Sequence, residues 1–163
     1  MAWTTPGTAT AGEVLTAAFW NTNVRDNSLE LAPFFSGFTN YTPTLTQSAT
    51  ISKTIVTARY LQIGKLVVVF FNLLGTSAGT AGNNVTVGLP VTARDGGSAF
   101  KYGVGHIYDD SAAVSYSGLF SAATTTSAVF VGDWSAAVGW GSNPSIAFTT
   151  NDRITGILLY EAA

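Results

Sequence analysis

Short segments rich in Val, Ile, Thr, Tyr and Phe recur along the chain from Asn40 onward, and Gly, Asn, Asp or Pro residues separate them. Segments of this length and composition are typical of β-strands, whereas the residues between them favour turns. A chain of roughly eight such strands without internal helices can bury its apolar side chains by packing or curling sheets. The sequence therefore predicts an all-β fold, a jelly-roll-like β-sandwich, for residues 40–163.

Two of these segments have informative patterns. Thr54–Ile63 alternates, with Ile55, Thr57, Arg59, Leu61 and Ile63 on one face, and Gly64-Lys65 predicts a tight turn after it. Leu66–Leu74 is apolar on both faces, so we expect it to be central in the sheet or buried at a subunit interface. Ser121–Ser127 is an Ala/Thr-rich stretch, which indicates a loop or a sheet edge. The other predicted strands are Asn83–Leu89, Phe100–Tyr108, Ala113–Phe120, Ala128–Trp134, Ser145–Phe148 and Arg153–Tyr160.

Residues 1–39 differ from the rest and predict an extended arm followed by a helix. Pro6-Gly7 breaks regular structure, Thr16 is a candidate helix N-cap, and Pro33 ends a helix that spans Ala17–Leu31. A single short helix is marginal in water. We therefore expect it to pack either on its own domain or on another chain.

One face of this predicted helix carries Trp20, Val24 and Leu31, with Asn27 between them. A polar residue within an apolar stripe can fix the register of a helical bundle. The alternative is that Asn27 simply faces solvent at a ragged stripe.

Low charge excludes several classes of function. Charged residues make up 10% of the chain and the net charge is −2, against roughly 25% charged residues in an average domain. With 47% hydrophobic residues the chain is not intrinsically disordered. It also lacks the basic field that nucleic acids or anionic membrane surfaces attract. The uncharged surface suits packing against other protein, and the longest apolar run is too short for a membrane helix of about 20 residues.

Few residues offer catalytic or metal-binding chemistry. The absence of cysteine excludes disulfides, thiolate zinc sites and cysteine nucleophiles. Gly75–Gly79 matches the nucleophile elbow G-x-S-x-G, but the residues after it cannot open a helix, so we interpret it as a Gly-rich hairpin loop. The single histidine, His106, is interpreted as an ordinary strand residue because no second histidine completes a site.

Calcium is the metal that the carboxylates of Asp109, Asp110 and Asp133 would suit best. Their spacing matches no calcium-loop motif, and Asp109-Asp110-Ser111 favours a turn. We predict no catalytic residue, no cofactor and no metal, and hence a protein that is not an enzyme.

Two sets of motifs resemble a known group of proteins. Trp3-Thr4-Thr5-Pro6, followed by Gly12-Glu13-Val14-Leu15-Thr16-Ala17-Ala18, Asn21 and Val24-Arg25-Asp26-Asn27, resembles the N-terminal segment of small tailed-bacteriophage virion proteins. The later stretch resembles the C-terminal β-sandwich of phage fibre and minor tail proteins. Its matching residues are Ala58-Arg59-Tyr60, Ile63-Gly64-Lys65, Val67, Val69, Gly88-Leu89-Pro90-Val91-Thr92-Ala93 and Tyr160-Glu161.

The resemblance implies a structural component on the surface of the phage particle, commonly a homotrimer, that docks through its N-terminal segment to capsid or tail proteins. It leaves open whether the protein is a capsid decoration (a head fibre) or the knob of a tail fibre. The expected docking residues are Trp3, Trp20, Val24, Arg25, Asp26, Asn27 and Leu31.

The low charge and the two-faced strand Leu66–Leu74 favour a large uncharged subunit interface in the β domain. Arginines are the cations most able to make directional hydrogen bonds between chains. The candidate residues of the trimer interface are Arg59, Leu66, Val68, Phe70, Arg94 and Arg153.

A second hypothesis is a carbohydrate-binding module that recognises host cell-wall glycans. Aromatic rings can stack on sugar rings, and Trp134, Trp140, Tyr108 and Tyr116 are the candidate contacts. The alternative is that these rings fill the core or a trimer seam, since aromatic side chains dominate burial.

Overall fold

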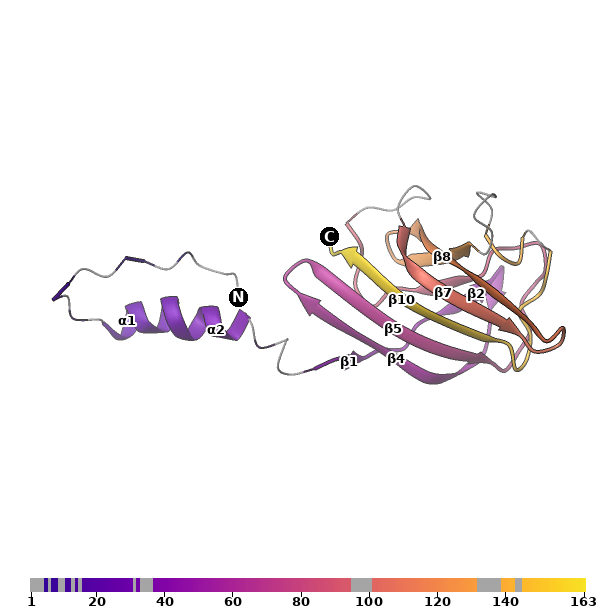
Figure 1. The fold of residues 1–163 in the computed structure, drawn as a ribbon, viewed down its shortest axis with the longest axis horizontal. Coiled ribbons are helices and arrows are strands. Elements are labelled where there is room, and N and C mark those ends of the chain that lie inside the picture. Colours follow the sequence, from indigo (N-terminus) through magenta and orange to yellow (C-terminus); the bar gives the residue numbers. More distant parts are fainter. Residues whose placement is uncertain are drawn as a thin grey trace.

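A computed structural model describes residues 5, 7–8, 11–12, 14, 16–30, 32, 37–94, 101–131, 139–142 and 145–163. These residues form a short helical segment followed by one curled antiparallel sheet (Figure 1). The prediction of a mostly β chain is confirmed.

Ten strands make up the sheet, in the order β1-β4-β5-β10-β7-β8-β9-β6-β2-β3. Their bounds are β1 (Thr39–Asn40), β2 (Leu45–Gln47), β3 (Ala49–Thr50), β4 (Lys53–Ile63), β5 (Leu66–Gly75), β6 (Thr86–Gly88), β7 (Lys101–Asp109), β8 (Val114–Thr124), β9 (Ser127–Val131) and β10 (Arg153–Glu161). The chain passes from β3 at one edge directly to β4 near the other edge. The curl brings those two edges within reach of a short connection.

The hairpin of β4 and β5 carries the longest pairing and follows the predicted pattern. Gly64 turns the chain between the two strands with a φ of 56°, a conformation that favours glycine. Strand β5 lies between β4 and β10, so the prediction that Leu66–Leu74 is central is confirmed. The predicted alternation of β4 holds from Thr57 onward, but a bulge between Ile55 and Thr57 shifts the register before it.

The core lies on the concave side of the curled sheet. Strand β5 alternates buried and half-exposed residues, and its buried members include Phe71 and Leu73. The ring of Phe71 meets Phe120 edge to face, with centroids 5.3 Å apart. Both rings pack where Gly156 has no side chain, because a Cβ there would lie 2.6 Å from Phe71 and 2.7 Å from Phe120. The sequence thus combines large rings with a strand glycine that makes room for them.

A buried glutamine connects the loops at one end of the sheet. The side chain of Gln47, fully buried, donates to the carbonyl oxygens of Asn83 at 3.0 Å and Ile146 at 2.7 Å. Its Oε1 accepts the backbone N–H of Phe148 at 2.8 Å. Gln47 therefore holds β2 to two loops that are distant in sequence.

Three details differ from the prediction. Ser145–Phe148 is not a strand, because its backbone bonds to the side chain of Gln47 and to the backbone of Gly79 and Gly141 instead of pairing with the backbone of a neighbouring strand. Strand β8 extends to Thr124, into the stretch Ser121–Ser127 that was expected to be a loop or an edge. The pairing of β8 with β9 stabilises this extension. Strands β1, β2 and β3 were not predicted, since each has only two or three residues.

The helical segment comprises α1 (Ala17–Trp20), the π-helix η1 (Asn21–Asp26) and α2 (Asn27–Glu30). Thr16 is its N-cap, as predicted, and its hydroxyl accepts the N–H of Phe19 at 3.1 Å. Figure 1 shows this segment projecting beyond the sheet on the side where β1 begins. The predicted stop at Pro33 lies outside the described residues.

The arm that precedes the helix folds back onto it. The amide of Asn23 accepts the backbone N–H of Gly7 at 2.6 Å and donates to the carbonyl of Phe19 at 2.9 Å. One turn later, Asn27 donates to the carbonyl of Asn23 at 3.3 Å and is only 4% exposed. The expectation that Asn27 faces solvent is therefore wrong, because residues four apart share a helix face and this face meets the arm.

Candidate interaction surface

The convex side of the sheet, which we call the outer face, carries a row of large side chains across four strands. Arg59 on β4 lies opposite Phe70 on β5, Phe70 opposite Ile157 on β10, and Ile157 opposite Val104 on β7. Ile157 is 48% exposed and Val104 is 57% exposed. Side chains that are directly opposite on adjacent strands touch one another, so this row is continuous.

A second apolar row lies two residues further along the strands. It consists of Leu61, Val68 and Leu159, which are cross-strand partners in the register of β4, β5 and β10. Leu159 is 56% exposed, and Leu66, at the end of the same face, is 45% exposed. Contiguous exposed apolar side chains of this kind mark interaction sites in soluble proteins.

A polar row follows on the other side of the first row. Thr57, Asn72, Thr155 and His106 are successive cross-strand partners on β4, β5, β10 and β7. Between this row and the first lies a shallow cavity of about 520 Å³ that is largely open to solvent. Its lining comprises Thr57, Arg59, Phe70, Phe71, Asn72, Val104, Gly105, Thr155, Gly156 and Ile157.

Asn72 is the notable residue of this cavity. Its Oδ1 atom is buried and accepts no hydrogen bond in the described part of the chain. A buried acceptor without a partner costs about 1–3 kcal/mol.

Arg59 is held at the rim by aromatic contacts. Its guanidinium carbon lies 5.4 Å from the ring centroid of Phe38. Phe38 in turn meets Phe70 edge to face at 5.2 Å. These contacts position a cation beside the cavity, and none of the described residues that line it carries a carboxylate.

The structure brings most of the predicted interface residues together. Arg59, Leu66, Val68 and Phe70 all lie on the outer face, and Arg153 lies on it beyond the polar row, opposite Leu74 and Tyr108. Arg94 forms an exposed ion pair of 3.0 Å with Glu161, which is the partner of Leu66 on β10. The predicted set omitted Val104, Ile157 and Leu159. For Ile157 and Leu159, the sequence did offer a signal, because Arg153–Tyr160 carries apolar residues on both faces.

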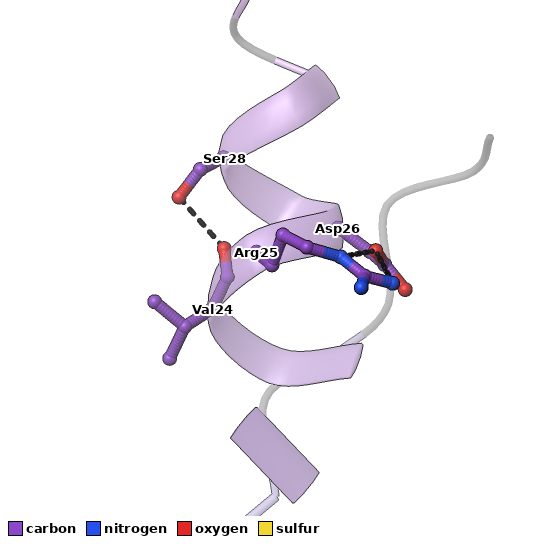
Figure 2. A network of polar contacts seen from close by, with 4 residues as sticks. All are labelled: Val24, Arg25, Asp26 and Ser28. Atoms are coloured by element: carbon purple, nitrogen blue, oxygen red, sulfur yellow. Dashed lines mark hydrogen bonds and ion pairs between the residues drawn. The ribbon is translucent and has the colours of Figure 1, made fainter. Parts of the chain in front are cut away.

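Two of the predicted docking residues present apolar surface on the helical segment. Trp20 is 54% exposed and Val24 is 39% exposed. Figure 2 shows Arg25 and Asp26 paired with each other at 2.8 Å, and the hydroxyl of Ser28 donating to the carbonyl of Val24. This pairing leaves little net charge beside Val24.

Asn27 does not fit its predicted docking role, because its side chain is buried within the chain itself. Trp3 and Leu31 lie outside the described residues. The exposed apolar residues Val14 and Leu29 were not among the predicted docking set, although both stand in the segment that carries the resemblance.

Of the aromatic residues predicted to contact glycans, the three that the structure describes are not gathered on one surface. Trp140 is fully buried, and its ring packs against Tyr116 at 5.4 Å and Phe148 at 6.4 Å. The prediction that Trp140 contacts a glycan is therefore wrong, and the alternative that it fills the core is confirmed. Tyr116 is half-buried by the same contact, Tyr108 is half-buried on β7, and Trp134 lies outside the described residues.

The remaining motifs have structural roles. After Gly75, the last residue of β5, the chain forms a loop through Gly79 in which the hydroxyl of Ser77 accepts the N–H of Ser52 at 2.8 Å. Asp109 is buried and accepts from Ser111 and Ala112 in the predicted turn. Asp133 lies outside the described residues, and within the described ranges no three His, Asp or Glu side chains cluster in a way that suits a metal ion.

Two buried tyrosines titrate far above neutral pH. Burial raises the pKa of Tyr160 to about 12, and its hydroxyl donates to the carbonyl of Val91 at 2.8 Å. Burial also raises the pKa of Tyr41 well above its ordinary value of 10.0. Both groups are neutral at physiological pH and offer no acid–base chemistry there.

Comparison with known protein families, curated proteins and solved structures found no match for this chain. Among the described helices, none combines the length and the apolar character that crossing a membrane requires.

Proposed function

We propose that this chain is a non-enzymatic structural protein of the surface of a bacteriophage particle, either a capsid decoration or the knob of a fibre. The phage assignment rests on the resemblance of the N-terminal segment and of the β-domain motifs. The assembly role rests chiefly on one observation. Exposed and half-exposed apolar side chains from β4, β5, β10, β7 and β8 form two adjoining rows on the outer face, and Leu119 on β8 extends the first row.

The outer face supports self-association into a homotrimer. Its two apolar rows place Phe70, Ile157 and Leu159 side by side without an intervening carboxylate. The cores of subunit interfaces are depleted of charge and rich in such residues. Arg59 and Arg153 stand at the borders of these rows, where a guanidinium can donate to a neighbouring subunit.

The helical segment supports docking to the particle. The arm is bound to the helix through Asn23, so the segment has its own internal structure. Trp20 and Val24 remain exposed on it, and tryptophan is among the residues that contribute most of the binding energy at the centre of interfaces.

We further propose that the curled sheet belongs to the jelly-roll type of β-sandwich. The direct step from β3 to β4 supports this, because it connects strands near opposite edges of the sheet. The hydrogen bonds of Gln47 to two distant loops also support it, because they join segments that are far apart in the chain.

Sedimentation of the full chain in dilute buffer tests the self-association. We expect a trimer, and we expect Leu159→Lys to shift it towards monomer because a charge would replace an exposed apolar contact. Thr50→Lys, on the exposed edge strand β3, is the matched control and should leave the trimer intact. A wild-type chain that sediments as a stable monomer contradicts the proposal.

Particle incorporation tests the docking. Trp20→Ala should reduce the amount of protein on purified particles while leaving its trimer unchanged, whereas Thr22→Ala, also exposed on the helical segment, should incorporate normally. Removing residues 1–32 should abolish incorporation. Full incorporation of the truncated chain contradicts the docking role.

A further inference from the structure

His106 is the one histidine of the sequence, and it lies on the outer face of the sheet. Its cross-strand partners are Thr155 on β10 and Ser117 on β8, so it belongs to the polar row. Histidine is the side chain that ordinarily gains a charge as the pH falls from about 8 to about 5. A change of pH in this range therefore acts on the outer face at a defined position.

This position is internal to the face proposed for self-association. On one side of His106 lies the apolar row that contains Val104 and Ile157, and on its other side lies Arg153. Residues two apart on a strand are only about 7 Å from each other. A second copy that covers both the apolar row and Arg153 must therefore also cover His106, which is already half-buried in the single chain.

The charged side chain nearest to His106 on this face is a cation. Arg153 on β10 is opposite Tyr108, so it lies diagonally across from His106. The remaining side chains of the outer face around His106 are aliphatic or carry a hydroxyl group: Val104 and Tyr108 on β7, Thr155 and Ile157 on β10, and Ser115, Ser117 and Leu119 on β8.

The carboxylates that are close in the sequence do not face His106. Asp109 is buried, and it shares the inner face of β7 with Ile107. Asp152 is fully buried, and its carboxylate accepts the backbone N–H groups of Asp110 and Thr149. Asp110 itself follows the end of β7, in the turn to β8. Within the described strands, a protonated His106 thus has a cation beside it and no carboxylate opposite it.

We propose that protonation of His106 weakens this subunit interface, so that the homotrimer forms near neutral pH and dissociates in mildly acidic solution. The inference rests on the proposed self-association. When the subunits assemble, each covered imidazole must either release its proton or keep a charge close to Arg153. A buried charge without a partner is strongly unfavourable, and like charges at close range repel. A low pH therefore favours the separate subunits, in which water solvates the charge.

Sedimentation of the full chain at about pH 8 and about pH 5.5, at one ionic strength, tests the switch. We expect the dissociation constant of the trimer to rise by at least about tenfold at the lower pH. His106→Gln keeps a polar side chain that does not titrate, so this variant should remain a trimer at both pH values. Asp110→Asn, which removes an exposed carboxylate from the turn after β7, is the matched control and should keep the pH response.

The possible failures are distinguishable. A trimer that is equally stable at both pH values overturns the switch and leaves the proposed self-association standing. Acid dissociation that persists in His106→Gln also overturns it, because other groups then carry the response. The same holds for dissociation that accompanies unfolding in both proteins, which tryptophan fluorescence of the same samples detects. A chain that is monomeric at about pH 8 contradicts the self-association itself, and the switch with it.

Discussion

Replacing Gln47 with leucine is expected to destabilise the β domain strongly, because it removes one buried and two partly buried hydrogen bonds and no apolar volume. The carbonyl oxygens of Asn83 and Ile146 and the N–H of Phe148 would lose their partner. Each buried backbone group left without a hydrogen bond costs about 1–3 kcal/mol. Their sum is roughly 3–9 kcal/mol, and water entering the loops offsets part of it. We therefore expect the free energy of unfolding to fall by about 3–5 kcal/mol.

Urea unfolding measured by tryptophan fluorescence checks this value, because Trp140 packs against Phe148 beside the lost bonds. The midpoint should move to lower urea while the slope stays constant, which indicates a change in stability alone. Gln62→Leu is the matched control, since Gln62 makes a single exposed hydrogen bond to the carbonyl of Gly64. It should change the free energy by less than about 0.5 kcal/mol. A loss below about 1 kcal/mol for Gln47→Leu would refute the reasoning, because water would then satisfy these groups as well as the glutamine does.

Three further outcomes are expected. Stability should be constant between about pH 8 and pH 10 and fall as the pH rises towards 12. Burial raises the pKa of Tyr160 to about 12 and that of Tyr41 further, so in this range the folded state holds protons that the unfolded state releases. Melting temperatures measured across this range check the prediction, and Tyr160→Phe should make their fall less steep. Asn23→Ala should release the arm at Gly7 and speed its proteolysis without changing the melt of the β domain. Gly156→Ala should cost about 1–3 kcal/mol in urea unfolding by overpacking two core phenylalanines, and an unchanged midpoint would contradict that packing.

The sequence predicted what local patterns determine. The strand at Leu66–Leu74 and the cap at Thr16 were predictable because periodicity and a single side-chain oxygen suffice to define them. The cavity was not predictable, because it depends on the cross-strand register that aligns Asn72 with Thr155, residues far apart in the chain. Burial of Trp140 likewise depends on a tertiary contact with Tyr116, which cannot be inferred from the residues next to Trp140 in the sequence.

The edges of the sheet limit how this protein can aggregate. Strands β1 and β3, at the two edges, are each only two residues long. The part of β4 that extends past β1 carries the bulge near Ile55 and begins at Lys53, and both features hinder the addition of a further strand. Chains of this protein therefore have little opportunity to polymerise edge to edge into fibrils. In the proposed homotrimer, contact through the outer face would close after three copies and give an assembly of defined size instead.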